Sequence, residues 1–212
     1  IALLSQIFPD SAGERARKVA RYSEDKAAFV KQRVQTADKK PSMMVLLQYS
    51  DKAIVTTGQN SFGQWWADAI GATNAANELT DKNSSKVTLE QVYKWNPDVV
   101  MITNFNKFLP KDIYQNTVGN YDWSGISAAK NQKVYKMPLG LYRSYTPGAD
   151  TPVTLLWLAK TVYPDLFADV DITKETVDYY KTVFDIALTN EQAQSIFAPP
   201  TQAGGGDSQR AQ

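Results

Sequence analysis

The segment 87–106 (VTLEQVYKWNPDVVMITNFN) constrains the fold more than any other part of the chain. Thr88 can accept a hydrogen bond from an amide of a first helical turn, and Asn96 cannot continue that helix because a residue before proline avoids the α region. The apolar run 99–102 that follows is typical of a strand covered on both faces, as in a parallel sheet flanked by helices. The sequence therefore predicts an α/β fold with a parallel or mixed sheet.

The residue types that are missing exclude several classes of function. The 212 residues include no cysteine and no histidine. Disulfides, Ser-His-Asp triads and Cys- or His-ligated metal sites are therefore excluded, and we expect no resident metal and no cofactor. The net charge of +1 does not favour nucleic acid as a partner, and no apolar stretch is long enough to cross a bilayer.

The two ends of the chain differ from its middle. Residues 9–40 are predicted to form one long helix, because small and apolar residues recur at helical spacing among charged ones until Pro41. Residues 1–8 are apolar, whereas the tail 199–212 contains consecutive glycines and is predicted to be disordered. The region 41–198 is then the folded domain.

Strands and helices alternate along this domain. Strands are predicted at 43–47, 53–57, 99–102 and 134–137. Helices are predicted at 62–70, 110–118, 123–131, 151–163, 173–187 and 190–196. Ligands of open α/β sheets bind outside the carboxyl ends of the strands, so the loops that follow strands are the candidate site.

The first such loop precedes the helix at 62–70 and contains Gln59, Asn60 and Ser61. Exposed amides and the positive end of a helix suit anionic or carbonyl-bearing ligands. The glycine spacing fits neither a Walker loop nor a dinucleotide fingerprint, so the sequence does not favour a nucleotide. Because Trp65 and Trp66 are adjacent in this helix, we expect one in the core and the other partly exposed.

Two further loops carry polar and aromatic side chains at predicted strand ends. The candidates are Asn104, Phe105 and Asn106 after the strand at 99–102, and Tyr142, Arg143 and Tyr145 after the strand at 134–137. Arg143 presents a planar fork of donors that matches oxyanions. The alternative is a surface loop whose arginine pairs with a nearby acid.

Five segments, taken in order, resemble the class III periplasmic binding proteins of ABC importers for iron–siderophore, haem, cobalamin and related complexes. They are GERARKVARYSEDKAAFVKQRV, TTGQNSFGQWWADAIGATN, VTLEQVYKWNPDVVMITN, WSGISAAKNQKVYKMP and TPVTLLWLAKTVYPDLF. The first is similar to the family's long helix between two lobes, and the last to its C-terminal helix. The resemblance extends over about residues 13–199.

The resemblance implies a three-layer, Rossmann-like lobe preceded by an interlobe helix. On this interpretation 1–8 is a remnant of an N-terminal lobe, 9–40 is the interlobe helix and 41–198 is the C-terminal substrate-binding lobe. The ligand would contact Gln59, Asn60, Ser61, Trp65, Asn104, Phe105, Tyr142, Arg143 and Tyr145. Aromatic rings would stack on a chelate, or a tyrosinate would ligate Fe(III). A lobe lacking its partner is also expected to bury its bare face by dimerisation.

The implied function is that of a non-enzymatic importer component. It would capture an Fe(III)-siderophore or similar metal complex and deliver it to a membrane permease, in the periplasm or outside the cell, with a lipid anchor as a further expectation. Glu90 lies at the family position that docks into arginines of the permease, and its alternative role is that of a first-turn glutamate favoured by the helix dipole. The segment PLGLYRSYTPGADTPVTLLWLAKTVYPDLF also resembles members proposed to take molybdate or tungstate.

Two other classes of function stay open at this point. One is an α/β enzyme with Asp or Glu as acid and base, and the other is a stand-alone interaction module. The enzyme is disfavoured because the predicted strand-end loops carry no pair of carboxylates and the chain has no His or Cys to act as base or nucleophile. A fold alone does not decide function, so the importer interpretation depends on the resemblance.

Overall fold

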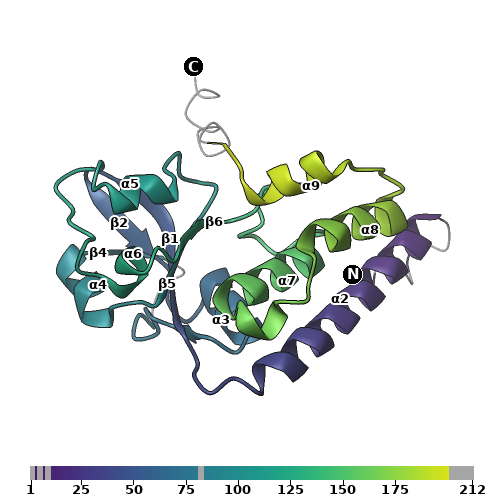
Figure 1. The fold of residues 1–212 in the computed structure, drawn as a ribbon, viewed down its shortest axis with the longest axis horizontal. Coiled ribbons are helices and arrows are strands. Elements are labelled where there is room, and N and C mark those ends of the chain that lie inside the picture. The colour runs from purple at the N-terminus through teal and green to yellow at the C-terminus, as the bar shows by residue number, and fades with distance from the viewer. Residues whose placement is uncertain (1–2, 4–6, 8–10, 81–83, 201–212) are drawn as a thin grey trace.

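The structure is a computed structural model, which describes residues 3, 7, 11–80 and 84–200. Figure 1 shows a sheet with small helices on one side of the view and a group of longer helices on the other. The predictions for 1–8 and 199–212 lie almost entirely outside the described residues. They stay predictions, as does the division of the chain into lobes.

The described strands form one six-stranded mixed sheet in the order β4-β2-β1-β5-β6, with β3 also paired to β1. The strands are β1 (Ser42–Ser50), β2 (Ala53–Thr56), β3 (Thr73–Asn74), β4 (Ser85–Val87), β5 (Val99–Ile102) and β6 (Val134–Lys136). β1, β5 and β6 are parallel neighbours, whereas β2 is antiparallel to both β1 and β4. The predicted mixed sheet is confirmed, but β3 and β4 were not predicted.

The helices fall where the sequence predicts them, although most are shorter than predicted and α9 ends one residue later. They are α2 (Ser11–Val34), α3 (Phe62–Ala69), α4 (Leu89–Trp95), α5 (Pro110–Tyr114), α6 (Ser127–Lys130), α7 (Thr151–Val162), a 3-10 turn (Asp165–Phe167), α8 (Ile172–Phe184) and α9 (Asn190–Phe197). The helix predicted to reach residue 40 ends at Val34, where the Thr36 hydroxyl donates to the Arg33 carbonyl at 2.7 Å. The helix predicted to reach residue 187 ends at Phe184, because Asp185 adopts a left-handed conformation with φ of 59°.

The helix–strand unit predicted from 87–106 is confirmed. The Thr88 hydroxyl accepts the Gln91 amide at 3.3 Å, which caps α4. Asn96 takes a left-handed conformation with φ of 44° and ends the helix. Every residue of β5 is buried, as expected for a strand with helices on both faces.

Alternation along β1 divides the core into two layers. Met43 and Val45 face a cluster with Trp66 and Leu155, from α3 and α7. Their neighbours on β1 face a second cluster, formed with residues of α4, α5 and α6. Successive strand residues point to opposite faces, so the sheet lies between two helical layers and the three-layer architecture is confirmed.

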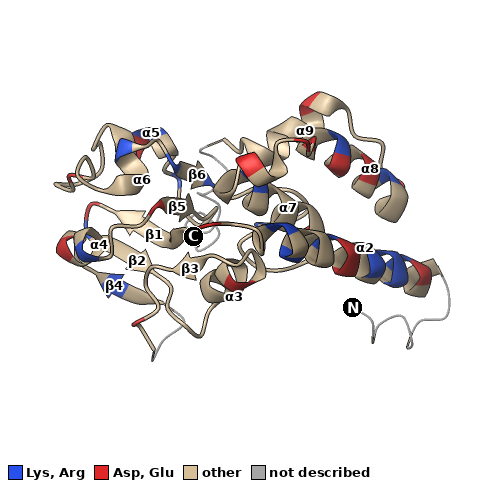
Figure 2. Ribbon diagram, turned by 60° about the horizontal axis from the view of Figure 1, so that its bottom comes forward, with Lys and Arg blue, Asp and Glu red and all other residues tan. Residues whose placement is uncertain are grey.

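Helix α2 is fastened to α7 and α8 rather than projecting alone (Figures 1 and 2). Its Lys26 Nζ lies 2.6 Å from Glu175 Oε2, and the Tyr22 hydroxyl donates to the same oxygen at 2.8 Å. Nearer its end, both terminal nitrogens of Arg33 donate to the two carboxylate oxygens of Asp169. Alternating charges cover the outer face of α2 in Figure 2.

Candidate functional site

Three loops meet in a hollow of about 520 Å³ at the edge of the sheet. Its lining residues are Leu47, Asn60, Ser61, Phe62, Ser84, Phe105, Tyr145 and Thr146. We call this feature the loop hollow. Asn60, Ser61, Phe105 and Tyr145 were predicted as ligand contacts from three separate segments, and the structure brings them together.

The first loop is held by its own polar groups. Ser61 is the N-cap of α3, where its hydroxyl accepts the Gln64 amide at 3.2 Å and donates to the Gly58 carbonyl at 2.6 Å. The Asn60 side-chain nitrogen donates to the Thr80 carbonyl at 2.9 Å. Both side chains therefore lie at the rim of the loop hollow, and the Asn60 nitrogen and the Ser61 hydroxyl are already paired within the protein.

Gln59 differs from its two neighbours, because it does not line the loop hollow. Its amide donates to the Leu79 carbonyl at 3.0 Å, and its side chain is exposed. The close approach of Leu79 also explains Gly58, since a Cβ at that position would lie 1.9 Å from the Leu79 carbonyl oxygen. Gln59 stays a predicted ligand contact, which only a ligand extending beyond the loop hollow would reach.

Aromatic rings form the wall of the loop hollow. The rings of Phe62 and Phe105 each pack edge-on against Tyr145, with centroid distances of 5.9 and 6.3 Å. The Arg143 guanidinium carbon lies 5.0 Å from the centroid of Phe105, a cation–π arrangement. Phe62, which is 46% exposed, was not predicted as a ligand contact. The available signal was an aromatic residue directly after the N-cap residue Ser61.

Tyr145 is held in the wall of the loop hollow. It is only 6% exposed, and the Trp66 indole nitrogen donates to its carbonyl at 2.9 Å. Burial raises the pKa of Tyr145, and interactions of its hydroxyl with Thr57, Gly63 and Ser61 only partly oppose the rise. At neutral pH Tyr145 therefore offers a neutral ring to the loop hollow, and ligation of Fe(III) by a tyrosinate stays a prediction.

The second loop contributes only Phe105 to the loop hollow. Asn104 is fully buried, and its side-chain nitrogen donates to the Pro138 carbonyl at 2.7 Å. The Asn106 side chain donates to the Leu46 carbonyl at 3.1 Å. Asn106 therefore pairs with the backbone of β1 and Asn104 with the chain that follows β6, and neither side chain faces solvent. The side chains of Asn104 and Asn106 thus support the second loop from its buried side.

A buried lysine, which the sequence analysis missed, also supports the second loop. Lys136 is 5% exposed, and its ammonium group donates to the carbonyls of Asn106 at 2.5 Å and Phe108 at 2.9 Å. Burial lowers the pKa of Lys136 to about 8, and the charge of Asp112 opposes that shift. No local pattern distinguishes this lysine from an exposed one, since only the pairing of β6 places it inside.

The part of the third loop before Ser144 lies beside the loop hollow, whereas Tyr145 and Thr146 line it. Tyr142 is 59% exposed, whereas Arg143 is half-buried, and its backbone forms an isolated antiparallel β-bridge with Leu139. Both line a small cavity of about 30 Å³ that shares Thr146 with the loop hollow. The third loop therefore borders the same face of the molecule.

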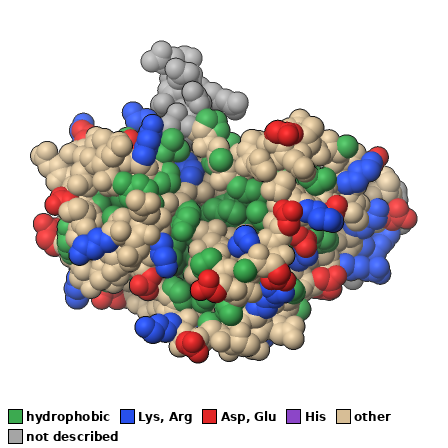
Figure 3. Space-filling model, in the orientation of Figure 1, with side chains coloured by type: hydrophobic (Ala, Val, Ile, Leu, Met, Phe, Trp, Pro, Cys, Tyr) green, Lys and Arg blue, Asp and Glu red, His purple; other side chains and the backbone are tan. Residues whose placement is uncertain are grey.

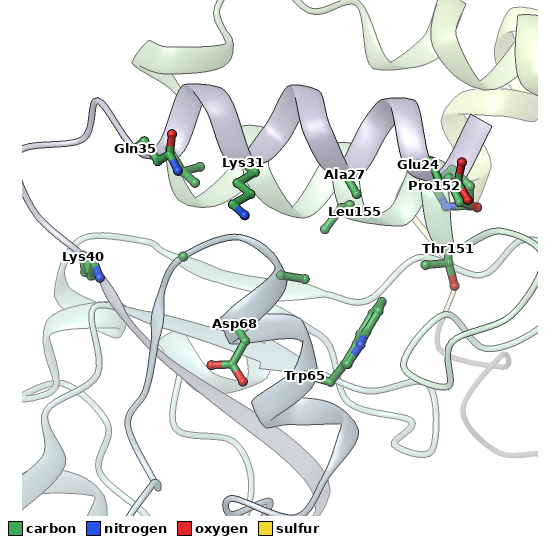
Figure 4. A pocket seen from close by; sticks show the side chains of 14 residues that line it. Glu24, Ala27, Lys31, Gln35, Lys40, Trp65, Asp68, Thr151, Pro152 and Leu155 are labelled. Carbon is green, nitrogen blue, oxygen red and sulfur yellow. The ribbon is translucent and has the colours of Figure 1, made fainter. Parts of the chain in front are cut away.

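Trp65 lies in a different depression, shown in Figure 4. This α2 groove, of about 640 Å³, is lined by Ser23, Glu24, Ala27, Lys31, Val34, Gln35, Lys40, Trp65, Asp68, Ala69, Gly71, Thr151, Pro152 and Leu155. Trp65 is 42% exposed and Trp66 is 1% exposed, which confirms that one is core and the other partly exposed. Figure 3 shows apolar side chains along a hollowed band between the two halves of the molecule.

Glu90 is exposed in the first turn of α4. Its own backbone amide and the Thr88 hydroxyl lower the pKa of its carboxyl group. The carboxylate is therefore charged at neutral pH and stands free of salt bridges among the residues that the structure describes. Its docking role stays a prediction.

Over the described ranges, no group of three or more His, Cys, Asp or Glu side chains is placed to hold a metal ion. Over the same ranges, no helix is both long and apolar enough to cross a membrane.

Residues 10–139 match the family model described as periplasmic binding protein, and the chain belongs to this family. Its structural neighbours identify the class III solute-binding proteins of ABC importers. These are transport proteins rather than enzymes, and the family is periplasmic.

Particular relatives differ in what they bind. A periplasmic solute binding protein of Veillonella parvula shares 30% identity and a TM-score of 0.80, covering 88% of this chain and 56% of that one. The molybdate-binding protein MolA of Haemophilus influenzae is 29% identical over 79% of this chain and 48% of its own length. The fold also matches Helicobacter pylori CeuE in a Ni-His complex, at 24% identity and a TM-score of 0.69, over 86% of this chain and 56% of that one. The chain thus spans about half the length of these relatives.

Proposed function

We propose that this chain is the substrate-binding lobe of an ABC importer's solute-binding protein, which captures a metal complex such as an Fe(III)-siderophore. The observation that carries the proposal is the convergence of Ser61, Phe105 and Tyr145, from three loops, on one aromatic-walled hollow. Pockets of this volume with apolar walls and few polar groups are typical of small-molecule sites. Such a protein binds and releases its cargo without chemical turnover.

Two features favour a chelate with organic groups over a bare oxyanion. The rings of Phe62 and Phe105 supply stacking surfaces. At the start of α3 the Ser61 hydroxyl already accepts the Gln64 amide, so one donor that an anion would use is engaged. An acidic chelate would place its anionic group near Arg143.

The second candidate is a molybdate- or tungstate-binding protein of the same family. It is favoured by the 29% identity to MolA, which binds molybdate. In that case Arg143 and backbone amides would supply the donors, and the rings would exclude water rather than stack. The two candidates therefore differ in whether the aromatic wall contributes to affinity.

We infer that a second lobe closes the other side of the binding face. The relatives are about twice as long as this chain, and the loop hollow and the α2 groove lie open on the described surface. In that arrangement α2 would connect the lobes, and Gln59, Trp65 and Tyr142 would meet the ligand or the opposite lobe. A second copy of this chain is the alternative cover.

Delivery to a permease would use Glu90. Its carboxylate is exposed and charged on the outer surface of α4, as an acidic docking residue must be. Delivery also requires a location outside the cytoplasmic membrane, in the periplasm, where a lipid anchor would keep the protein close to its permease. Glu90→Gln should leave ligand affinity unchanged and weaken binding to the cognate permease in proteoliposomes.

A thermal-shift panel tests the proposed function. The intact polypeptide would be titrated with ferric siderophores of catecholate and hydroxamate type, haem, cobalamin, molybdate and tungstate. A rise in melting temperature with one ferric complex supports the first candidate, and a rise with molybdate or tungstate alone supports the second. No rise with any ligand would reject both in favour of an interaction module.

A further inference from the structure

Asp150 is a buried carboxylate that contacts the loop carrying Tyr142 and Arg143. It is 6% exposed and occupies the N-cap of α7, yet its side chain makes no capping hydrogen bond to that helix. Instead, Oδ2 accepts the Leu141 amide at 2.5 Å and Oδ1 accepts the Tyr180 hydroxyl at 2.9 Å. An N-cap carboxylate ordinarily accepts an amide of its own helix, so this one is turned toward the loop.

The loop backbone packs directly on this pair of side chains. A Cβ on Gly140 would lie 2.3 Å from Asp150 Oδ2 and 2.6 Å from the Tyr180 hydroxyl oxygen. On the other side of Asp150, the Tyr179 hydroxyl donates to the Ala149 carbonyl. Two adjacent tyrosines of α8 therefore anchor both the carboxylate and the chain that leads to it.

A carboxylate suits this place because it only accepts hydrogen bonds. Each oxygen of Asp150 serves a different donor, one from the loop and one from α8. Alanine would remove both acceptors, whereas asparagine could accept the Leu141 amide on its oxygen and donate to the Tyr180 oxygen, because a tyrosine hydroxyl also accepts. The Asp150 side chain thus joins the loop to α8 through two acceptor oxygens.

We propose that Asp150 is a positioning residue that holds Tyr142 and Arg143 on the binding face, an inference that rests on the proposed function for its ligand readout. Arg143 lies over the ring of Phe105, which lines the loop hollow. Loss of the carboxylate would leave the Leu141 amide without its acceptor. The loop would then separate from α8 while the sheet and the first two loops keep their places.

Limited trypsin digestion tests whether the loop is released. The intact polypeptide would carry Asp150→Ala, Tyr180→Phe or Gly140→Ala, with Asp171→Ala, at the exposed N-cap of α8, as the matched control. We expect cleavage after Arg143 to accelerate roughly tenfold in Asp150→Ala, because the Leu141 amide and the Tyr180 hydroxyl lose their acceptor and proteolysis follows the open population. Cleavage after Lys133, which is exposed ahead of β6, should not change.

Ligand affinity is measured on the same variants with two probes, molybdate and ferric tris(2,3-dihydroxybenzoate). The probe that the wild-type protein binds should bind at least about tenfold more weakly to Asp150→Ala and with unchanged affinity to Asp171→Ala. Unchanged cleavage after Arg143 would overturn the inference, as would equal acceleration at all sites with a lower melting temperature, or a released loop with unchanged affinity. If the wild-type protein binds neither these probes nor any ligand of the thermal-shift panel, the proposed function fails, and the digestion alone decides whether Asp150 holds the loop.

Discussion

Arg143 and Tyr145 are two positions apart in the third loop but contribute differently to the binding face. The Arg143 guanidinium group lies over Phe105, close to where a ligand would enter the loop hollow. Tyr145 is 6% exposed, and its hydroxyl contacts the first turn of α3. Burial raises its pKa, so Tyr145 acts as a neutral ring at neutral pH. The guanidinium group is therefore the charged contributor from this loop.

Arg143→Ala should weaken binding of an anionic ligand about tenfold or more, because a charge-assisted hydrogen bond is lost. The free energy of unfolding should change little, since the side chain is only half-buried. Calorimetric titration and urea unfolding of the same preparation measure the two effects. A large loss of stability would show instead that Arg143 has a structural role.

Trp157→Ala should lower the free energy of unfolding by about 3–5 kcal/mol, as for other buried aromatic side chains. Trp157 is 8% exposed, and its ring stacks on Phe197 with a centroid distance of 6.2 Å. Trp65→Ala is the matched control, because Trp65 is 42% exposed in the α2 groove. Equal losses in the two variants would contradict this account of the core.

At the scale of elements, local signals in the sequence predict helix positions well. Thr88 and Asn96 mark the two ends of α4, and both act as predicted. The short edge pairings β3 and β4 were missed, because two or three residues carry no periodic pattern and depend on their partners in the sheet. The end of α2 was also misplaced, since polar residues after Val34 suit a helix and a turn equally.

The N-cap of α3 offers a test of how the first loop is built. Ser61→Ala should cost about 1 kcal/mol of the free energy of unfolding, because the Gln64 amide loses its acceptor. Ser61→Asp should restore most of that stability, since an aspartate also caps. Urea unfolding at neutral pH measures both variants. An unchanged Ser61→Ala protein would show that the Ser61 cap does not stabilise the start of α3.

At the scale of the whole molecule, parallel pairing explains which parts of the site the sequence could predict. The rule that ligands bind at strand ends correctly groups loops that are far apart in the chain, and Asn60, Phe105 and Tyr145 meet in the loop hollow. The rule does not predict which way a side chain points. Asn104 is directed inward and Trp65 lies in the α2 groove, because the extended β1 and the packing of α2 are tertiary features.

Lys136 makes the stability of the molecule depend on pH in a defined window. Its pKa of about 8 lies below the ordinary value of 10.5, so between these values the unfolded chain binds more protons than the folded one. Its contribution to the free energy of unfolding is therefore constant below about pH 8 and rises as pH increases from there. The wild-type protein should gain stability relative to Lys136→Met between about pH 8 and pH 9.5, before tyrosines titrate.

Urea unfolding of both proteins across this range measures the difference. Subtracting the free energies of unfolding of the two proteins removes the contributions of the tyrosines whose pKa values are raised by burial. Those contributions act in the opposite direction at higher pH. A difference that does not change with pH would mean that Lys136 titrates normally and is not enclosed beneath the second loop.

The central claim is that three loops of this lobe form one wall of a ligand site. Amide hydrogen exchange of the intact polypeptide, with and without the ligand that raises its melting temperature, tests that claim most directly. We expect ligand-dependent protection in peptides covering 58–65, 103–108 and 139–147, and none in α8 or α9. Protection confined to the α2 groove or to the C-terminal helices would contradict the account and place the ligand elsewhere.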